Sequence, residues 1–97
     1  MATYIVLGKF TDEGAKDIRN IRERAEGNMQ RGKQLGLNPK GWYMTMGRYD
    51  FVVVLEGPDD ETMAAQVLGV GTRGGSRTET LRAFPLDEVE TIIQKLS

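Results

Sequence analysis

The chain of 97 residues holds 13 Lys or Arg and 14 Asp or Glu, so it lacks the net positive charge that attracts a protein to nucleic acid or to an anionic membrane. It has no cysteine and no histidine, which excludes disulfides, thiol and Ser-His catalysis, and the commonest zinc ligands. We expect one domain, residues 1–97, with no bound metal and no cofactor.

The N-terminal third predicts a strand and one long amphipathic helix. The segment TYIVLGKF, residues 3–10, is rich in β-branched and aromatic residues, which is typical of a strand. Thr11 has the side chain of a helix N-cap, and acidic residues follow it. Apolar residues then recur at steps of three and four until Gly36, a residue type that favours a helix C-terminus. The segment LNPKG, residues 37–41, is expected to be a loop.

The middle of the chain predicts a β-hairpin. The segments WYMTM, residues 42–46, and FVVVLE, residues 51–56, are typical of strands, and only a tight turn can join them. A two-residue type II′ turn centred on Gly47 and Arg48 fits, because glycine tolerates the positive φ of the first central position. The longest apolar run, FVVVL, is too short to span a membrane and the N-terminus lacks signal-peptide features, so we expect a cytoplasmic protein.

The rest of the chain predicts a helix, a strand and a final helix. The segment PDDE, residues 58–61, fits a helix start better than a carboxylate metal site, because proline and acidic residues favour the first turn. This helix fades into the glycine-rich GVGTRGG, residues 69–75, and a strand follows at residues 76–84. Pro85 then begins a last helix. Its apolar residues are expected to face inward: Leu86, Val89, Ile92, Ile93 and Leu96.

This order, strand-helix-strand-strand-helix-strand with an added C-terminal helix, predicts an α+β, ferredoxin-like domain. In that fold an antiparallel sheet carries both helices on one face, and we expect the strand order 4-1-3-2. The other face, the open face, is then bare, and a monomer would leave its apolar residues in water. We therefore expect a homodimer, or a higher homo-oligomer, that buries the open face against a second sheet.

Strand alternation divides the side chains between the two faces. The helix-facing set on the hairpin is Trp42, Met44, Met46, Phe51, Val53 and Leu55. The open-face set on the hairpin is Tyr43, Thr45, Asp50, Val52 and Val54. We extend the open-face set with Tyr4 and Val6 on the first strand and Thr78, Thr80 and Arg82 on the fourth. Glu79 is then sent toward the helices with Leu81 and Ala83, which leaves the partner of its carboxylate open.

These assignments predict a half-polar cavity at one end of the open face. We expect the first and third strands to run parallel and the other two to oppose them, so that Arg82, Tyr4, Asp50 and Thr45 meet. The predicted ligand-binding residues are Arg82, Asp50, Tyr43, Thr45, Tyr4, Tyr49, Thr78 and Thr80. Arg82 would hold a carboxylate or an enolate, and Asp50 or Tyr43 would handle a proton. The structural alternative is that Arg82 and Asp50 only pair, with each other or across the dimer interface.

The segment GVGTRG, residues 69–74, has the letters of the dinucleotide-binding fingerprint. That fingerprint requires a strand before it and a helix after it, whereas here a predicted helix precedes and a predicted strand follows. A flexible loop is therefore the better interpretation. A further alternative is that Arg73 and Arg77 attract an anion to the backbone amides of this loop.

Three ordered segments resemble one known family. They are YIVLGKFTDEG near the start, GRYDFVVVLEGPDDE in the middle and SRTETLRAF near the end. Together they resemble the GYD domain family, called after a Gly-x-Tyr-Asp hairpin that corresponds here to Gly47, Tyr49 and Asp50. The resemblance covers nearly the whole chain and implies a ferredoxin-like domain related to the dimeric α/β barrels, but it implies no reaction. The glycine-rich residues 69–77 depart from the family pattern.

The leading functional prediction is a cytoplasmic, homo-oligomeric module that binds a small organic molecule in the half-polar cavity, as a sensor or a carrier. One alternative is a cofactor-independent enzyme of the dimeric α/β barrel type, isomerase-like or monooxygenase-like, whose catalysis would rest on Asp50, Tyr43 or Tyr49. Another alternative is a purely structural assembly protein. In each case the expected partner is a second copy of the chain, and neither nucleic acid nor a membrane.

Overall fold

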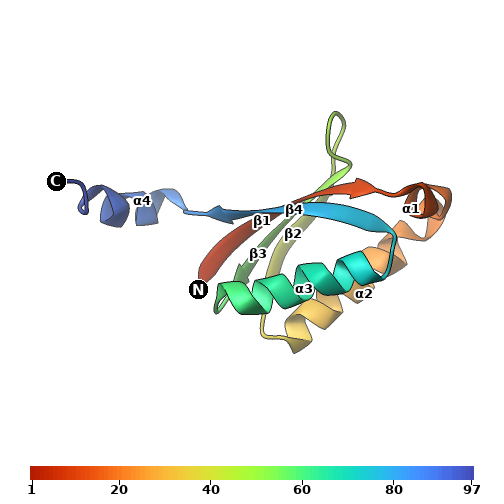
Figure 1. The fold of residues 1–97 in the computed structure, drawn as a ribbon, viewed down its shortest axis with the longest axis horizontal. Helices are drawn as coiled ribbons and strands as arrows, with labels where there is room; N and C mark the ends of the chain where they lie inside the picture. The colour runs from red at the N-terminus through yellow and green to blue at the C-terminus, as the bar shows by residue number, and fades with distance from the viewer.

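The computed structural model describes residues 1–97 as a four-stranded sheet with helices against one face (Figure 1). The strands lie in the order β2-β3-β1-β4, which confirms the predicted ferredoxin-like α+β fold. In Figure 1, α2 and α3 lie side by side below the sheet, and the face above it is open. The strands are β1 (Ala2–Phe10), β2 (Asn38–Met44), β3 (Phe51–Gly57) and β4 (Ser76–Ala83). The helices are α1 (Asp12–Lys16), the short 3₁₀ helix η1 (Ile18–Asn20), α2 (Ile21–Gln34), α3 (Asp60–Thr72) and α4 (Leu86–Ile93).

All neighbouring strands in the sheet are antiparallel. The expectation that the first and third strands run parallel is therefore wrong. Each helical connection returns the chain to a strand of the same direction, so β1 and β2 run one way while β3 and β4 run the other way. The order of the sheet alternates between these two pairs, and no parallel strands are neighbours. The start of β1 thus lies beside the ends of β3 and β4, far from the hairpin.

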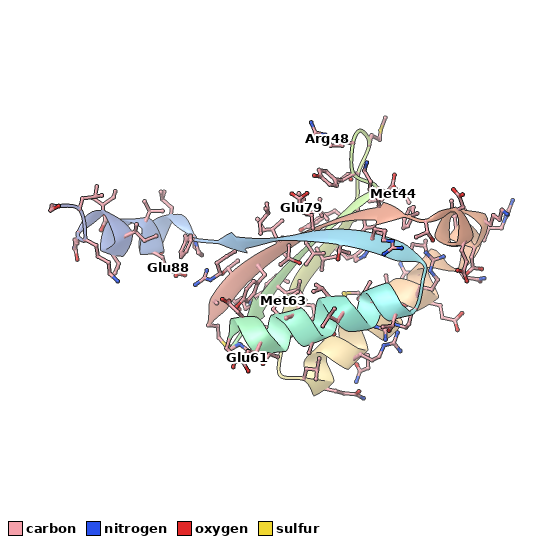
Figure 2. All side chains as sticks on the ribbon, viewed as in Figure 1. Met44, Arg48, Glu61, Met63, Glu79 and Glu88 are labelled. Atoms are coloured by element: carbon pink, nitrogen blue, oxygen red, sulfur yellow. The ribbon has the colours of Figure 1, made fainter.

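The pairing register also corrects the two faces of the sheet, because directly opposite residues share a face. Tyr4 lies opposite Leu55 and Arg82, and its side chain is only 3% exposed beneath the helices. The open-face placement is therefore wrong for Tyr4, Val6, Thr78, Thr80 and Arg82. Conversely, Glu79, Leu81 and Ala83 lie on the open face, and Figure 2 shows Glu79 on the side of the sheet away from α3. Alternation tells which residues of one strand share a face, but it does not tell which face the helices cover.

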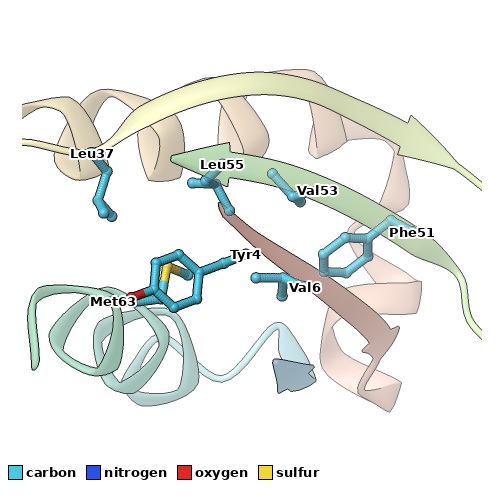
Figure 3. Packing of buried hydrophobic residues seen from close by; sticks show 7 residues of the cluster. All are labelled: Tyr4, Val6, Leu37, Phe51, Val53, Leu55 and Met63. Carbon is cyan, nitrogen blue, oxygen red and sulfur yellow. The ribbon is translucent and has the colours of Figure 1, made fainter. Parts of the chain in front are cut away.

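The hydrophobic core lies between the sheet and the helices (Figure 3). Phe51 is its aromatic centre, with ring centroids 5.5 Å from Phe10 and 5.4 Å from Trp42. Full burial of each large apolar side chain contributes about 1.5–3 kcal/mol, so this cluster is the main stabilising element of the monomer. The buried cluster consists of Tyr4, Val6, Leu37, Phe51, Val53, Leu55 and Met63.

The predicted long helix after β1 is broken into α1, η1 and α2. Thr11 is confirmed as the N-cap, because its Oγ1 accepts a hydrogen bond from the N–H of Gly14 at 3.1 Å. The break falls at Asp17, whose carboxylate accepts a bond of 2.5 Å from Asn20 Nδ2. Asp and Asn side chains that bond locally compete with the helical backbone, which explains the interruption. The C-terminal glycine is also confirmed, since Gly36 follows α2 with a φ of +98°.

Strand β2 begins earlier than predicted and takes in most of the segment assigned to a loop. It tolerates Pro39 because it is an edge strand with an irregularity between Pro39 and Gly41. The hairpin connection is residues 45–50 and not a two-residue turn. Gly47 within it has a φ of +113°, which bears out the need for glycine, whereas the predicted core residue Met46 is fully exposed.

The two later helices differ in how they are attached. Asp59 caps α3 by accepting a bond of 2.8 Å from the N–H of Thr62, which confirms the predicted helix start. The glycine-rich segment is helical as far as Thr72. Helix α4 does not pack inward as predicted, because β4 carries the chain past the end of the domain and α4 projects away from it (Figure 1). The longest extent of the molecule is 51 Å.

Candidate functional site

The predicted cavity residues divide between the two ends of the sheet. Arg82 lies opposite Tyr4 at the start of β1, whereas Asp50 bonds to the backbone of Gly8 and Phe10 near the end of β1. Tyr4 and Phe10 are six residue steps apart along β1, a distance of about 20 Å. The prediction that Arg82, Tyr4, Asp50 and Thr45 meet at one end of the sheet is therefore wrong. Asp50 and Arg82 of one chain do not pair. The cause is the strand direction corrected above.

At the Tyr4 end of the sheet, the hydroxyl of the buried Tyr4 lies beside the carboxylate of Asp60. Tyr4 Oη donates a hydrogen bond of 2.5 Å to Asp60 Oδ1 at the start of α3. This bond, together with burial and the charge of Asp60, raises the pKa of the Tyr4 hydroxyl, and the charge of Arg82 opposes the rise. The Arg82 guanidinium is exposed and lies 4.4 Å from the ring centroid of Phe84. Its charge is therefore held over aromatic rings and not in a ligand cavity.

The Gly-Tyr-Asp segment ties the hairpin to the rest of the sheet. Asp50 donates its N–H to Gly8 O at 2.7 Å, and its Oδ2 accepts from the N–H of Phe10 at 2.8 Å. Asp50 thus extends the ladder between β1 and β3 by one side chain. Tyr49 Oη donates to Glu79 Oε1 at 3.1 Å, which supplies the partner that the sequence left open. Thr45 Oγ1 donates to Tyr49 O at 2.6 Å and holds the loop closed.

The two remaining threonines lie on the helix-covered face. Thr78 lines a narrow internal space of about 60 Å³ between the sheet and the helices, next to Val6 and Phe51. Thr80 lies opposite Val6 and is exposed. Neither is near Tyr43, which is 59% exposed on the open face as predicted.

The open face carries a continuous apolar patch. Ile5 lies between Val54 and Leu81, and Leu7 lies opposite Val52. These side chains are half-buried or exposed because no other part of the chain covers this face of the sheet. The sequence reasoning missed three of its members, and the signal that identifies them is the register with the correctly assigned Val52 and Val54. We call the following residues the open-face patch: Ile5, Leu7, Tyr43, Val52, Val54 and Leu81.

Helix α4 is a second uncovered apolar surface. It leaves the end of β4 and lies apart from the rest of the chain (Figure 1). Its first turn is acidic, with Asp87 and Glu88, and none of its residues is buried. We call residues 84–97 the C-terminal arm. The large apolar side chains of the arm are exposed to these extents: Phe84 48%, Leu86 83%, Ile92 41%, Ile93 53% and Leu96 75%.

The remaining points concern the segment with the dinucleotide-binding letters, clusters of metal-binding side chains and membrane-spanning helices. The segment with the dinucleotide-binding letters follows a helix and precedes a strand, so it lacks the context of that fingerprint. No cluster of three or more acidic side chains is placed to hold a metal ion. No helix of the chain has both the length and the apolar character that a membrane crossing requires.

The fold and its surfaces define a class of small α+β domain with an uncovered sheet face and a projecting C-terminal arm. The chain belongs to the GYD domain family, whose family model matches residues 4–93. It is 36% identical over 90 residues to a Thermus thermophilus protein called "Glutamine synthetase and cystathionine beta-lyase binding protein". That match covers 92% of this chain and 95% of the relative. No solved structure matches the chain.

Proposed function

We propose that this chain is a homo-oligomeric protein-binding module that uses its C-terminal arm to engage another protein in the cytoplasm. The carrying observation is the arm, in which Leu86, Ile93 and Leu96 are 53–83% exposed on a segment that projects from the domain. Apolar side chains held outside a domain gain most free energy when a partner covers them. The name of the 36% identical relative, a binding protein for two enzymes, supports a protein partner.

The size of the arm explains why self-association belongs to this proposal. The five large apolar side chains of the arm are on average a little more than half exposed, so covering them is equivalent to fully burying about three side chains and gives on the order of 5–9 kcal/mol before any cost. Association costs on the order of 4–15 kcal/mol, so one arm alone gives weak binding. A homodimer formed through the open-face patch would present two arms together, and the second arm would bind at a high effective concentration. The dimer thus supplies the affinity that one arm lacks.

The charge of the arm limits the kind of partner surface. Asp87 and Glu88 lie in its first turn, and Glu90 lies beside them, while Lys95 is its one basic residue. A partner groove with an apolar floor and basic residues at its edge is complementary to this pattern. The candidate partners are the glutamine synthetase and the cystathionine beta-lyase of the organism that encodes this chain, by analogy with the relative.

The test is binding of these two purified enzymes to the immobilised protein by biolayer interferometry. Ile93→Lys places a charge in the apolar stripe of the arm, and Leu68→Lys, at a side chain of α3 that is 69% exposed, is the matched control. We expect Ile93→Lys to weaken enzyme binding by tenfold or more and Leu68→Lys to leave it unchanged. Equal binding by wild type and Ile93→Lys, or no binding of either enzyme by wild type, would contradict the proposal.

A small organic ligand on the open face is a second, narrower proposal. It is supported by the hydrogen bond of 3.1 Å between Tyr49 and Glu79, beside the apolar Leu7. From Leu7 the open face continues across the sheet through Val52 to Tyr43. A second sheet facing this region would turn it into a half-polar cavity. A compound that stabilises the wild type in a thermal-shift screen should lose its effect in Glu79→Gln, and an unchanged effect would place its site elsewhere. The enzyme and assembly-protein alternatives remain predictions.

A further inference from the structure

A polar cavity of about 200 Å³ lies between α1, α2 and the turn from α3 to β4. Figure 1 shows α1 and this turn at the end of the molecule opposite the C-terminal arm. Val70 is the only apolar residue that lines the cavity. Three of its lining side chains are arginines, Arg24, Arg31 and Arg73. A cavity with this lining suits a small charged ligand and not an apolar one.

Two of these arginines converge on one neutral oxygen. Arg31 Nη2 donates to Asn28 Oδ1 at 3.0 Å, and Arg73 Nε donates to the same oxygen at 3.1 Å. Neither guanidinium has a carboxylate within salt-bridge distance, whereas Arg24 pairs with Asp17 at 3.4 Å. Two like charges that share an amide oxygen repel each other, and an anion between them would relieve that repulsion.

The position of Asn28 is fixed by the packing of α2 against α3. Its backbone carbonyl accepts a hydrogen bond of 2.8 Å from Gln66 Nε2, and Gln66 is a buried side chain of α3. Burial and the charge of Arg31 lower the pKa of Arg73, as expected for a cation with no neutralising partner. Asn28 is therefore held in place by the fold before any ligand binds, and each of the two exposed arginines has a hydrogen bond to its side chain.

We propose that Arg31 and Arg73, positioned by Asn28, form a binding site for a phosphate-class oxyanion, either inorganic phosphate or the phosphoryl group of a small ester. Guanidinium groups present planar pairs of N–H donors that match phosphate oxygens. Two guanidinium groups that form no ion pair favour a doubly charged phosphate over chloride or a single carboxylate. The alternative that the sequence offers pairs Arg73 with Arg77 for an anion, but Arg77 lies in β4 opposite Lys9 and does not line the cavity.

One lining carboxylate without a salt-bridge partner, that of Glu13, opposes an anion in this cavity. Glu13 lines it, and Glu13 Oε2 lies 3.1 Å from the point where a Cβ on Gly74 would be. The ionised lining groups are Arg24, Arg31 and Arg73 against Glu13 and Asp17, so the cavity has a net charge of +1. Removing the charge of Glu13 should therefore strengthen the binding of an anion. This opposite effect separates a specific site from a general loss of positive charge.

The experiment titrates the wild-type protein with inorganic phosphate and, separately, with methyl phosphate, by isothermal titration calorimetry at constant ionic strength with chloride as the reference anion. Arg31→Gln and Arg73→Gln are the test variants, and Glu13→Gln is expected to bind more tightly. Arg22→Gln is the matched control, because Arg22 is exposed on the same helix and only approaches Glu26 at 3.9 Å. Thermal melts of each variant show that it is folded.

We expect saturable phosphate binding by wild type and by Arg22→Gln, about tenfold weaker binding by Arg31→Gln and by Arg73→Gln, and tighter binding by Glu13→Gln. If methyl phosphate binds as well as phosphate, the natural ligand is an ester, and if it does not, free phosphate is the ligand. Equal binding by all variants, or no saturation in wild type beyond the chloride reference, overturns the proposal. The site lies apart from the arm, so Ile93→Lys should leave phosphate binding unchanged, and either proposal can fail alone.

Discussion

Gly8→Ala should destabilise the protein strongly, because the space beside Gly8 is filled by the ring of Phe51. A Cβ at Gly8 would fall within 3.0 Å of three ring atoms of Phe51, closer than real Cβ atoms come to other heavy atoms. The ring cannot move aside easily, since Phe10 and Trp42 lie 5.5 and 5.4 Å from its centroid. Overpacking costs about 1–3 kcal/mol, and complete loss of a buried Phe costs about 3–5 kcal/mol. The expected cost therefore lies at about 2–4 kcal/mol.

The opposing effect is smaller. Replacing glycine with alanine restricts the unfolded chain and stabilises a protein by about 0.4–1 kcal/mol where the new side chain fits. Gly71→Ala, in α3, is the comparison because no atom outside the local helix backbone lies within 4 Å of its added Cβ. Thermal unfolding at one fixed protein concentration should lower the Tm of Gly8→Ala by roughly 10–30 °C and leave Gly71→Ala at or above wild type.

A double mutant tests the physical cause. Phe51→Leu removes the ring atoms that an added Cβ at Gly8 would meet. In the Phe51→Leu background, Gly8→Ala should cost much less than it does in wild type, which is a coupling between neighbouring sites. If the two costs are additive, or if Gly8→Ala alone melts like wild type, the argument from the Phe51 ring is refuted.

Three further predictions concern the dimer, the hairpin and alkaline pH. Val54→Asp puts a charge in the open-face patch, so light scattering should show a shift from oligomer to monomer or aggregate, and a wild type that is monomeric at micromolar concentration would disprove the dimer. Asp50→Ala leaves the N–H of Phe10 without its acceptor and should cost about 1–3 kcal/mol in urea unfolding, whereas Asp50→Asn should recover most of it, and equal loss in both variants would show that the charge matters. Because the pKa of Tyr4 is raised in the folded state above its ordinary value of 10.0, the stability from its neutral hydroxyl is present below pH 10.0 and is lost as the pH rises through the raised pKa. Tyr4→Phe should lack this part of the alkaline loss, and the same alkaline loss in both proteins would contradict the role of the bond to Asp60.

Local signals in the sequence predicted most of the fold. Thr11 and Asp59 cap helices as expected, and Gly36 and Gly47 have the positive φ values that their positions required. These features depend on a few neighbouring residues, so the sequence contains what is needed to find them. The hairpin strands were also assigned to the correct sides, because the short connection between them links their alternation.

The features that the sequence did not reveal depend on distant parts of the chain. Alternation in β1 allows either set of side chains to face the helices. Only the pairing with β3 shows that Tyr4 is buried under the helices and that Ile5 lies on the open face. Helix α4 has an apolar stripe like that of a core helix, and its sequence does not show that β4 carries it beyond the domain. The bond from Arg73 to Asn28 joins residues 45 positions apart, which no short motif records.

The hydrogen bonds of the Gly-Tyr-Asp hairpin indicate where functional differences should be sought. Asp50 uses its carboxylate to extend the ladder to β1, and Tyr49 uses its hydroxyl to reach Glu79 on β4. Removing a side chain that accepts a bond from a backbone N–H of the sheet lowers the stability of the fold. The first role of such a side chain is therefore structural. A motif with this role identifies the fold of a chain but says little about what the chain binds. Binding specificity is then expected in surfaces that the sheet and the core support without using, and three such surfaces are the open-face patch, the C-terminal arm and the Arg31 and Arg73 pair.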